Sequence, residues 1–199
     1  MIEPRQITAL ILAGGKSRRM GGRDKGLLPF GDGLLVGHVL SAILPQVGGV
    51  MINANRHQAE YAQLGCPVVA DSLADFQGPL AGFLAGLEQL QTEYLLTLPC
   101  DGPIVVADLA PRLANGLDEA GADIAVAHDG RRLQPVYALL HRRVLPDLRA
   151  ALAEGERKID RWYPRNAWVT VDFSDVPEQF SNINTPEDYA AVGREVSGK

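Results

Sequence analysis

Short apolar runs alternate with longer amphipathic stretches along the first two thirds of the chain. The short runs are predicted strands and cover residues 7–12, 50–53, 67–70, 94–98 and 123–127. The stretches between them repeat apolar positions at helical spacing and are predicted helices over 34–44, 56–64, 80–90 and 107–117. This alternation predicts β-α-β units, which form a parallel sheet with helices on both faces.

The pattern changes after residue 127. Asp129 and Gly130 form a turn signal before the apolar run 135–140, which predicts a hairpin. The same kinds of signal predict a helix over 144–152, a strand over 168–171 and a helix over 185–192. The 199 residues contain no repeat and no low-complexity linker. We therefore predict one domain over residues 1–199: a three-layer α/β/α, Rossmann-like fold with a mostly parallel sheet and a late mixed portion.

Composition and charge narrow the class of ligand. Hydrophobic residues make up 46% of the chain and the formal net charge is −5, which argues against a nucleic-acid-coating surface. The chain has only two cysteines, Cys66 and Cys100, and their spacing is not that of metal ligands. So few cysteines fit a protein of the reducing cytoplasm. The N-terminus does not read as a signal peptide, and no apolar run approaches the ~20 residues of a membrane span. We expect a cytoplasmic protein without membrane or nucleic-acid partners.

The loop after the first predicted strand combines glycines with cations. Residues 13–25 read Ala-Gly-Gly-Lys-Ser-Arg-Arg-Met-Gly-Gly-Arg-Asp-Lys. A glycine-rich turn offers backbone N–H groups to a phosphate, and Lys16, Arg18, Arg19 and Lys25 supply the opposite charge. On an acidic protein this local positive spot predicts a small anionic ligand, and a triphosphate fits best. The alternative is a surface loop whose cations are solvated.

Two commoner phosphate-binding motifs do not fit this loop. Gly15-Lys16-Ser17 lacks the glycine that a Walker A motif places five residues earlier, where Leu10 stands. The dinucleotide fingerprint also fails, because Lys16 occupies the position of its second glycine. A kinase or hydrolase built on this motif is therefore the weakest hypothesis.

Polar or small residues follow four of the predicted strands, as Ala13-Gly14-Gly15, Asn53-Ala54-Asn55, Asp71-Ser72 and Cys100-Asp101. In a parallel sheet these ends lie along one edge, where ligands bind. Asp101 is the strongest single candidate, because Mg²⁺ often takes one or two carboxylates together with substrate phosphates. Mn²⁺ is the alternative cation. The alternative for Asp101 is the N-cap of the helix that follows.

The other strand-end residues each allow two interpretations. Asp71 contacts a sugar or a metal, or only forms a turn. Asn53 and Asn55 read a base edge or a ribose, or only favour a turn. Gly78 and Gly82 place small residues at a helix start, where a ligand fits or where the helix packs closely on the sheet.

Lys25 and the histidines complete the set of candidates. Lys25 meets a phosphate, or only pairs with Asp24 or Asp32 at the surface. No Ser-His-Asp or Cys-His constellation can be built. Surface or packing roles are expected for the scattered histidines, which are His38, His57, His128 and His141.

The motif from Leu12 to Lys25 resembles the signature of the nucleotidyltransferases with a glycosyltransferase-A-like fold. Within them the chain most closely resembles the molybdenum cofactor guanylyltransferase (MobA) family, over nearly its whole length. The later motifs that carry this resemblance are Asn53-Ala-Asn-Arg-His57, Asp71-Ser-Leu-Ala-Asp75, Gly78-Pro-Leu-Ala-Gly82, Pro99-Cys-Asp101 and Asn182-Ile-Asn-Thr-Pro-Glu187.

The resemblance implies transfer of GMP from GTP to molybdenum-molybdopterin, which gives molybdopterin guanine dinucleotide and pyrophosphate. It implies Mg²⁺ on Asp101, catalytic roles for Lys25, Asp101 and Arg19, and molybdopterin contacts from Asn182 and Asn184. The GTP-binding residues it implies are Leu12, Ala13, Gly14, Gly15, Lys25, Asn53, Asp71, Gly78, Gly82 and Asp101. It thereby assigns GTP to residues from about 1 to 105 and the pterin to residues from about 106 to 199.

The chemistry agrees with the absence of a prominent histidine. The attacking group is already an anionic phosphate, so catalysis needs positioning and charge neutralisation rather than a strong base. A cytidylyltransferase acting on the same pterin, another NTP-dependent nucleotidyltransferase and a non-catalytic molybdenum cofactor carrier stay open as alternatives. Residues 129–165 carry few motifs, so no pterin contact is assigned there. Expected protein partners are other molybdenum cofactor biosynthesis proteins and chaperones of apo-molybdoenzymes.

Overall fold

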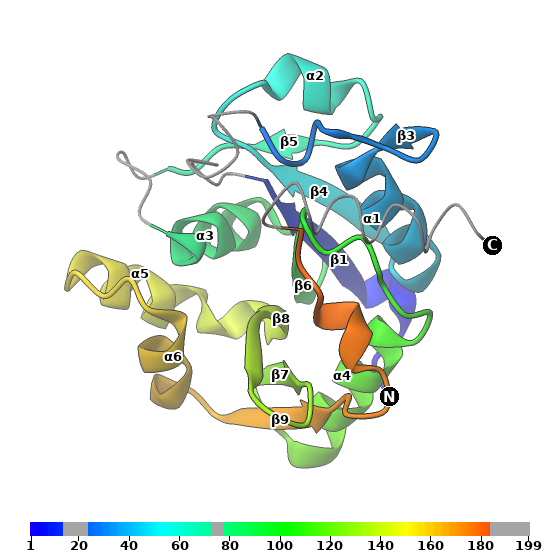
Figure 1. The fold of residues 1–199 in the computed structure, drawn as a ribbon. Coiled ribbons are helices and arrows are strands. Elements are labelled where there is room, and N and C mark those ends of the chain that lie inside the picture. Colours follow the sequence, from blue (N-terminus) through cyan, green and yellow to red (C-terminus); the bar gives the residue numbers. More distant parts are fainter. Residues whose placement is uncertain (14–23, 73–77, 184–199) are drawn as a thin grey trace.

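One seven-stranded sheet forms the centre of the molecule in the computed structural model, which describes residues 1–13, 24–72 and 78–183 (Figure 1). The strands lie in the order β5-β4-β1-β6-β8-β7-β9. Their bounds are β5 Val68–Val69, β4 Gly49–Asn53, β1 Ile7–Leu12, β6 Tyr94–Pro99, β8 Leu133–His141, β7 Ile124–His128 and β9 Trp168–Asp172. The pairs of β8 with β6 and β7 are antiparallel and the other pairs are parallel. The predicted mostly parallel sheet with a late mixed portion is confirmed.

Helices cover both faces of the sheet, which confirms the three-layer prediction (Figure 1). One layer holds α1 Leu35–Ile43, α2 Gln58–Ala62 and α4 Leu109–Ala120; the other holds α3 Pro79–Gln89, α5 Leu145–Ala153 and α6 Ile159–Trp162. Side chains of a strand point alternately to its two faces, so a strand between two layers is apolar throughout. In β1, Ala9 and Ile11 enter one core and Leu10 enters the other.

The predicted hairpin forms, but its second strand enters the middle of the sheet. The turn is closed by the Asp129 N–H, which donates to the Arg132 carbonyl at 3.1 Å. From there β8 runs back between β6 and β7, rather than along an edge. A hairpin signal predicts that two strands pair, but it carries no information about what lies on the far side of the second strand.

Several short elements were not predicted. The two-residue strands β2 Pro29–Phe30 and β3 Gly33–Leu34 form a small hairpin, and such strands are too short to show a period of two. The helix predicted over 56–64 is shorter in the structure. It begins only at Gln58, because His57 adopts a left-handed backbone conformation with φ 52° directly before α2, and it ends at Ala62. The helix predicted over 185–192 lies outside the described residues.

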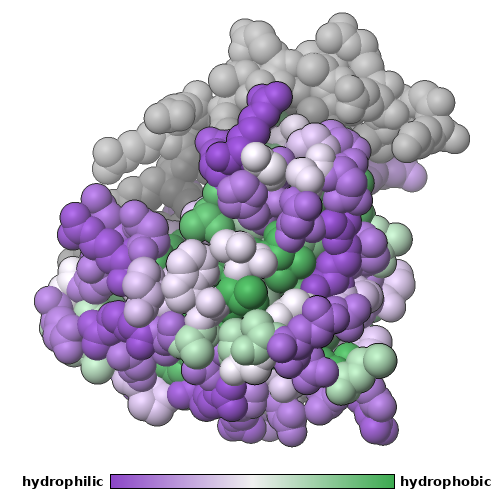
Figure 2. Space-filling model, turned by 90° about the horizontal axis from the view of Figure 1, so that it is seen from below, coloured by the Kyte–Doolittle hydropathy of each residue, from purple (hydrophilic) through white to green (hydrophobic). Residues whose placement is uncertain are grey.

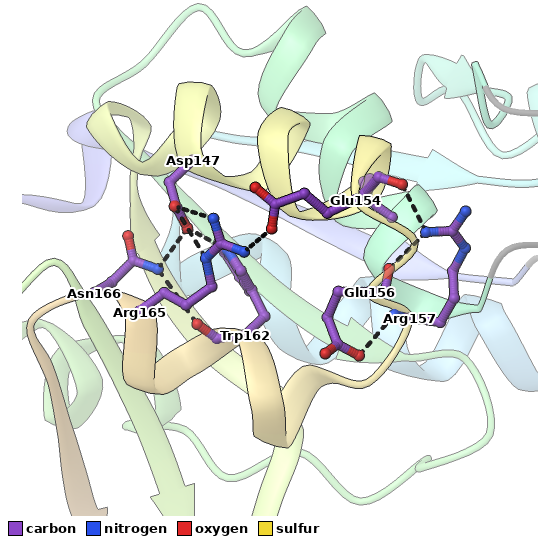
Figure 3. A network of polar contacts seen from close by, with 8 residues as sticks. Asp147, Glu154, Glu156, Arg157, Trp162, Arg165 and Asn166 are labelled. Carbon is purple, nitrogen blue, oxygen red and sulfur yellow. Dashed lines mark hydrogen bonds and ion pairs between the residues drawn. The ribbon is translucent and has the colours of Figure 1, made fainter.

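A polar network fixes the short helix α6 against α5 (Figure 3). Its centre is Asp147, whose carboxylate accepts from Trp162 Nε1 at 2.9 Å and from Arg165 Nε at 3.1 Å. Arg165 also contacts Glu154 Oε2 at 2.6 Å. This network places the loop between the two helices, where the Arg157 carbonyl lies 3.6 Å from the position that a Cβ on Gly78 would take. Residues 129–165, where the sequence shows few motifs, therefore approach the start of α3 at Gly78.

Most of the exposed side chains in Figure 2 are hydrophilic, and hydrophobic residues gather in the middle of that face. Within the described ranges, the large hydrophobic side chains with high exposure are Met1, Leu44 and Trp168. Trp168 packs against the Tyr163 ring, with 6.2 Å between the ring centroids. No helix in these ranges has the length and apolar character needed to cross a membrane.

A buried glutamine holds the irregular segment between β6 and α4. Gln46 Nε2 donates to the Val106 carbonyl at 2.8 Å, and its Oε1 accepts from the Ala110 N–H at 3.0 Å. Gln46 is 6% exposed, so water cannot readily replace these bonds. One side chain, in the 3-10 turn Leu44–Gln46 after α1, therefore bonds both the segment that follows Asp101 and the first turn of α4.

Replacing Gln46 with leucine should lower the free energy of unfolding by about 3 kcal/mol, because each buried backbone group left unpaired costs about 1–3 kcal/mol. Urea denaturation followed by circular dichroism measures the change. The exposed Gln63 provides the control, and Gln63→Leu should change the urea midpoint little. Equal midpoints for Gln46→Leu and wild type would contradict this role.

Candidate functional site

The four polar strand ends lie side by side, as predicted for a parallel sheet. β5, β4, β1 and β6 are consecutive neighbours and run in the same direction. Backbone hydrogen bonds continue past the strand ends: the Ala13 N–H donates to the Asn53 carbonyl at 2.8 Å, and the Cys100 N–H donates to the Leu12 carbonyl at 3.1 Å. Leu12, Ala13, Asn53 and Asp101 therefore lie on one edge of the sheet.

Asn53, Asn55 and Asp71 form one cluster on the β4–β5 side of this edge. Asn53 Nδ2 donates to Asp71 Oδ1 at 2.9 Å, and Asn55 Nδ2 donates to Asp71 Oδ2 at 2.7 Å. The Asp71 N–H donates in return to Asn55 Oδ1 at 2.8 Å. These bonds fix the orientation of the carboxylate and both amides, so the polar groups at this edge of the sheet are preorganised. Contact with a base or a ribose stays a prediction for all three residues.

Gly78 and Gly82, the two glycines of the Gly78-Pro-Leu-Ala-Gly82 motif, have different structural roles. Gly78 precedes α3 with φ +81°, a backbone conformation that residues other than glycine rarely adopt. Gly82 is buried within α3, and a Cβ there would lie 2.6 Å from Leu12 Cδ2 and 2.7 Å from Asn53 Oδ1. The helix packs closely on the strand ends at Gly82, so a larger residue would displace the side chain of Asn53. Contact of either glycine with a nucleotide stays a prediction.

Lys25 and Asp101 form an ion pair at the end of β6. Lys25 Nζ lies 3.1 Å from Asp101 Oδ2, and the two side chains are 17% and 18% exposed. The alternative in which Lys25 only pairs with Asp24 or Asp32 at the surface is wrong, because the side chain is largely buried and pairs with Asp101. Contact of Lys25 with a phosphate stays a prediction. The N-cap alternative for Asp101 is also wrong, because α4 begins after Asp108. Partial burial weakens solvent screening, so both charges act strongly on a nearby ligand.

The Asp101 carboxylate fits a divalent cation. It is a hard oxygen donor, and Mg²⁺ is often bound by one or two carboxylates plus substrate phosphates. Within the described part of the chain, no group of three or more histidine, cysteine, aspartate or glutamate side chains is arranged to hold a metal. A metal on Asp101 would therefore draw its further ligands from substrate, water or residues outside those ranges.

Neutral buried groups lie behind Asp101. Burial, with the Asp101 charge as a lesser cause, raises the pKa of the Cys100 thiol and of the Tyr137 phenol well above their ordinary values. The Tyr137 hydroxyl has no hydrogen-bond partner among the described residues and lies where a side chain on residue 102 would point. Gly102 is therefore needed for Tyr137 to fit. The thiol and the phenol are therefore neutral, unlike Asp101 and Lys25 beside them.

The C-terminal part of the described chain returns to Asp101. The Ile183 N–H donates to the Asp101 carbonyl at 2.8 Å, and Ile183 is buried against Phe30 and Leu35. Asn182 Oδ1 lies 3.3 Å from the position that a Cβ on Gly102 would take. The structure thus brings Asn182, predicted for the pterin side, next to Asp101. Gly14, Gly15, Lys16, Arg18, Arg19 and Asn184 lie outside the described residues.

The four histidines make local contacts. His38 Nε2 lies 2.7 Å from the Phe30 carbonyl, and the other three contact Glu60 (His57), the Gly130 N–H (His128) and the Arg143 N–H (His141).

Sequence reasoning missed Tyr61, whose hydroxyl contacts Asp24 next to Lys25. The available signal was an aromatic residue with a polar tip in a largely polar helix, since a buried tyrosine usually finds a hydrogen-bond partner.

Comparison with known proteins decides the family. A family model described as "MobA-like NTP transferase domain" matches residues 9–167. The chain belongs to the MobA-like NTP transferase family. Its curated relatives include the molybdenum cofactor guanylyltransferase of Shewanella sediminis, 47% identical over 92% of this chain and 93% of that protein. The protein of the same name from Ralstonia nicotianae is 50% identical over 93% of this chain and 95% of its own length. This MobA-like chain is a nucleotidyltransferase.

Solved structures share the fold of the MobA-like chain. Molybdopterin-guanine dinucleotide biosynthesis protein A from Archaeoglobus fulgidus superposes with a TM-score of 0.81 at 23% identity, covering 96% of this chain and 100% of that one. A 4-diphosphocytidyl-2C-methyl-D-erythritol synthase from Anaerococcus prevotii superposes with a TM-score of 0.71 at 13% identity, covering 98% of this chain and 100% of that one. Because proteins named for guanine and for cytidine compounds share the fold, the fold does not select the base.

Proposed function

We propose that this MobA-like transferase moves GMP from GTP to molybdenum-molybdopterin and releases pyrophosphate. The observation that carries the proposal is the Lys25–Asp101 pair at the end of β6, with Asn182 beside it. The proposal is supported by the relatives named molybdenum cofactor guanylyltransferase, which are 47% and 50% identical over most of the chain. The charged pair suits a phosphate ligand, and the names of the relatives favour GTP.

In the proposed reaction, an oxygen of the pterin's terminal phosphate attacks the α-phosphorus of GTP. A new P–O bond forms, the bond to the β-phosphate oxygen breaks, and pyrophosphate leaves with the electron pair. Lys25 neutralises charge that builds on the leaving group, and we assign Arg19 the same task. A divalent cation held by Asp101, Mg²⁺ or Mn²⁺, would supply further neutralisation of phosphate charge. Because the attacking oxygen is anionic, no residue has to remove a proton.

We assign the two substrates to two parts of the chain. GTP is placed on residues from about 1 to 105, on the β4–β1–β6 strand ends, with the base or ribose near the Asn53–Asn55–Asp71 cluster. Molybdopterin is placed on residues from about 106 to 199, through Asn182 and Asn184. The position of Asn182 Oδ1, 3.3 Å from where a Cβ on Gly102 would lie, supports this arrangement, because the attacking phosphate has to approach Asp101. Proposed partners are the proteins that supply the pterin and those that receive the product, in the cytoplasm.

The test supplies each nucleoside triphosphate, labelled at the α-phosphate, together with molybdenum-loaded pterin and Mg²⁺. We expect label from GTP to enter the dinucleotide at least about tenfold faster than label from CTP, a difference of about 1.4 kcal/mol in activation free energy. Preferential transfer of CMP would overturn the guanylyl assignment. Binding of GTP and pterin with no pyrophosphate release would instead identify a carrier.

A further inference from the structure

Tyr61 lies in the core beside the loop that carries Lys25. Its side chain is 0% exposed, and its hydroxyl donates to Asp24 Oδ1 at 2.6 Å. Burial is the main cause that raises the pKa of this phenol far above its ordinary value, so the hydroxyl keeps its proton and stays a donor. Charge-assisted hydrogen bonds to a carboxylate are shorter and stronger than neutral ones. The Asp24 carboxylate is therefore held by a rigid partner.

The same contact fixes the residue after Lys25. Asp24 Oδ1 also accepts from the Gly26 N–H at 3.2 Å. A Cβ on Gly26 would lie 2.5 Å from the Tyr61 hydroxyl oxygen, so the backbone approaches the phenol as closely as only glycine allows. Tyr61 thus contacts the chain on both sides of Lys25: it donates a hydrogen bond to Asp24, and the Gly26 backbone packs closely against its hydroxyl.

Two backbone bonds complete the turn. The Lys25 carbonyl accepts from the Leu28 N–H at 3.1 Å, and the Gly26 carbonyl accepts from the Val36 N–H at 3.0 Å. With its backbone held at these points, the Lys25 side chain extends to Asp101 Oδ2 at 3.1 Å. A long flexible lysine loses much rotamer freedom in such a geometry, so a fixed backbone makes the ammonium position reproducible.

We propose that Tyr61 is a positioning residue for phosphoryl chemistry, which acts through Asp24 to set the place of the Lys25 ammonium. The helix that carries it, α2, is also attached to the other side of the site, because Gln58 Nε2 donates to the Ala54 carbonyl at 3.1 Å. Tyr61 thereby links the Asn53–Asn55 strand end to the lysine. This inference rests on the proposed nucleotidyl transfer.

The test is a double-mutant cycle on kcat for nucleotide transfer, with Tyr61→Phe and Lys25→Ala. Tyr61→Phe alone should lower kcat about tenfold, which equals about 1.4 kcal/mol. In the Lys25→Ala background the same change should alter kcat less than about twofold, because the Lys25 ammonium through which Tyr61 acts is already absent. A purely structural role predicts the same factor in both backgrounds, and that result would overturn the proposal, as would full activity of Tyr61→Phe.

Tyr163→Phe is the matched control. Tyr163 is also fully buried, and its hydroxyl donates to the Pro135 carbonyl at 2.6 Å in the opposite core. It should lose stability comparably to Tyr61→Phe and keep wild-type kcat. Should Tyr61→Phe not fold, Asp24→Ala removes the same contact, and it should show the same loss of additivity with Lys25→Ala. If the wild type transfers a nucleotide other than GMP, the proposed function fails while the cycle is still read with that nucleotide.

Discussion

Replacing Asp101 with asparagine should lower the rate of GMP transfer by about 10³ or more while the fold stays intact. The substitution keeps the shape of the side chain and removes the charge that holds Lys25 and, in the proposed reaction, the cation. Losing electrostatic stabilisation of a transferring phosphoryl group typically costs factors of about 10²–10³ for one contact, and here two interactions depend on one carboxylate. The readouts are kcat from labelled GTP and pyrophosphate release.

The control for Asp101 is Asp108→Asn in the same segment. Asp108 precedes α4, and its side chain is 59% exposed, so its loss should leave transfer unchanged. Circular dichroism and thermal unfolding of both variants establish that each is folded. Wild-type pyrophosphate release from folded Asp101→Asn would refute the role of this carboxylate in the reaction.

Replacing Lys25 with alanine should lower kcat by about 10²–10³, because the proposed reaction then loses one preorganised cation that neutralises phosphate charge. The KM for GTP should rise by a smaller factor, since charge builds on the leaving pyrophosphate mainly in the transition state. Steady-state kinetics over a range of GTP concentrations separate the two effects. Unchanged kcat with a raised KM would mean that Lys25 only binds GTP.

Arg5→Ala serves as the charge control for Lys25. Arg5 precedes the opposite end of β1, and its side chain is 82% exposed. Removing this cation changes the net charge by the same amount as Lys25→Ala. Transfer should continue at the wild-type rate, so an equal loss in both variants would attribute the effect of Lys25 to overall charge.

The central strands could be predicted closely because burial on both faces leaves an unambiguous signal. β1 has the predicted bounds, Ile7–Leu12, since six consecutive residues of low polarity allow little else. The edge shared by Asn53, Asp71 and Asp101 followed from the parallel direction alone. Neither step required knowledge of side-chain contacts.

The remaining features depend on pairings that have no local signature. The position of β8 between β6 and β7 is a choice among neighbours that the Asp129–Gly130 turn does not restrict. The contact between Asp24 and Tyr61 spans 37 residues and depends on how α2 settles on the sheet. The sequence did not indicate the pairing of Lys25 with Asp101 for the same reason, because Asp24 and Asp32 are near in sequence and Asp101 is near only in space.

The place of β8 also affects how the chain can acquire its structure. Until residues 133–141 have emerged from the ribosome, β6 has an open edge of unpaired N–H and C=O groups on the side away from β1. Such an edge invites pairing with other chains during synthesis. The edge of β6, which ends just before Asp101, is therefore covered by β8, a strand from the part of the chain that we assign to the other substrate. The proposed assignment of two substrates to two parts of the chain therefore concerns ligand binding alone. It does not imply that residues 1–105 fold before residues 133–141 are available to pair with β6.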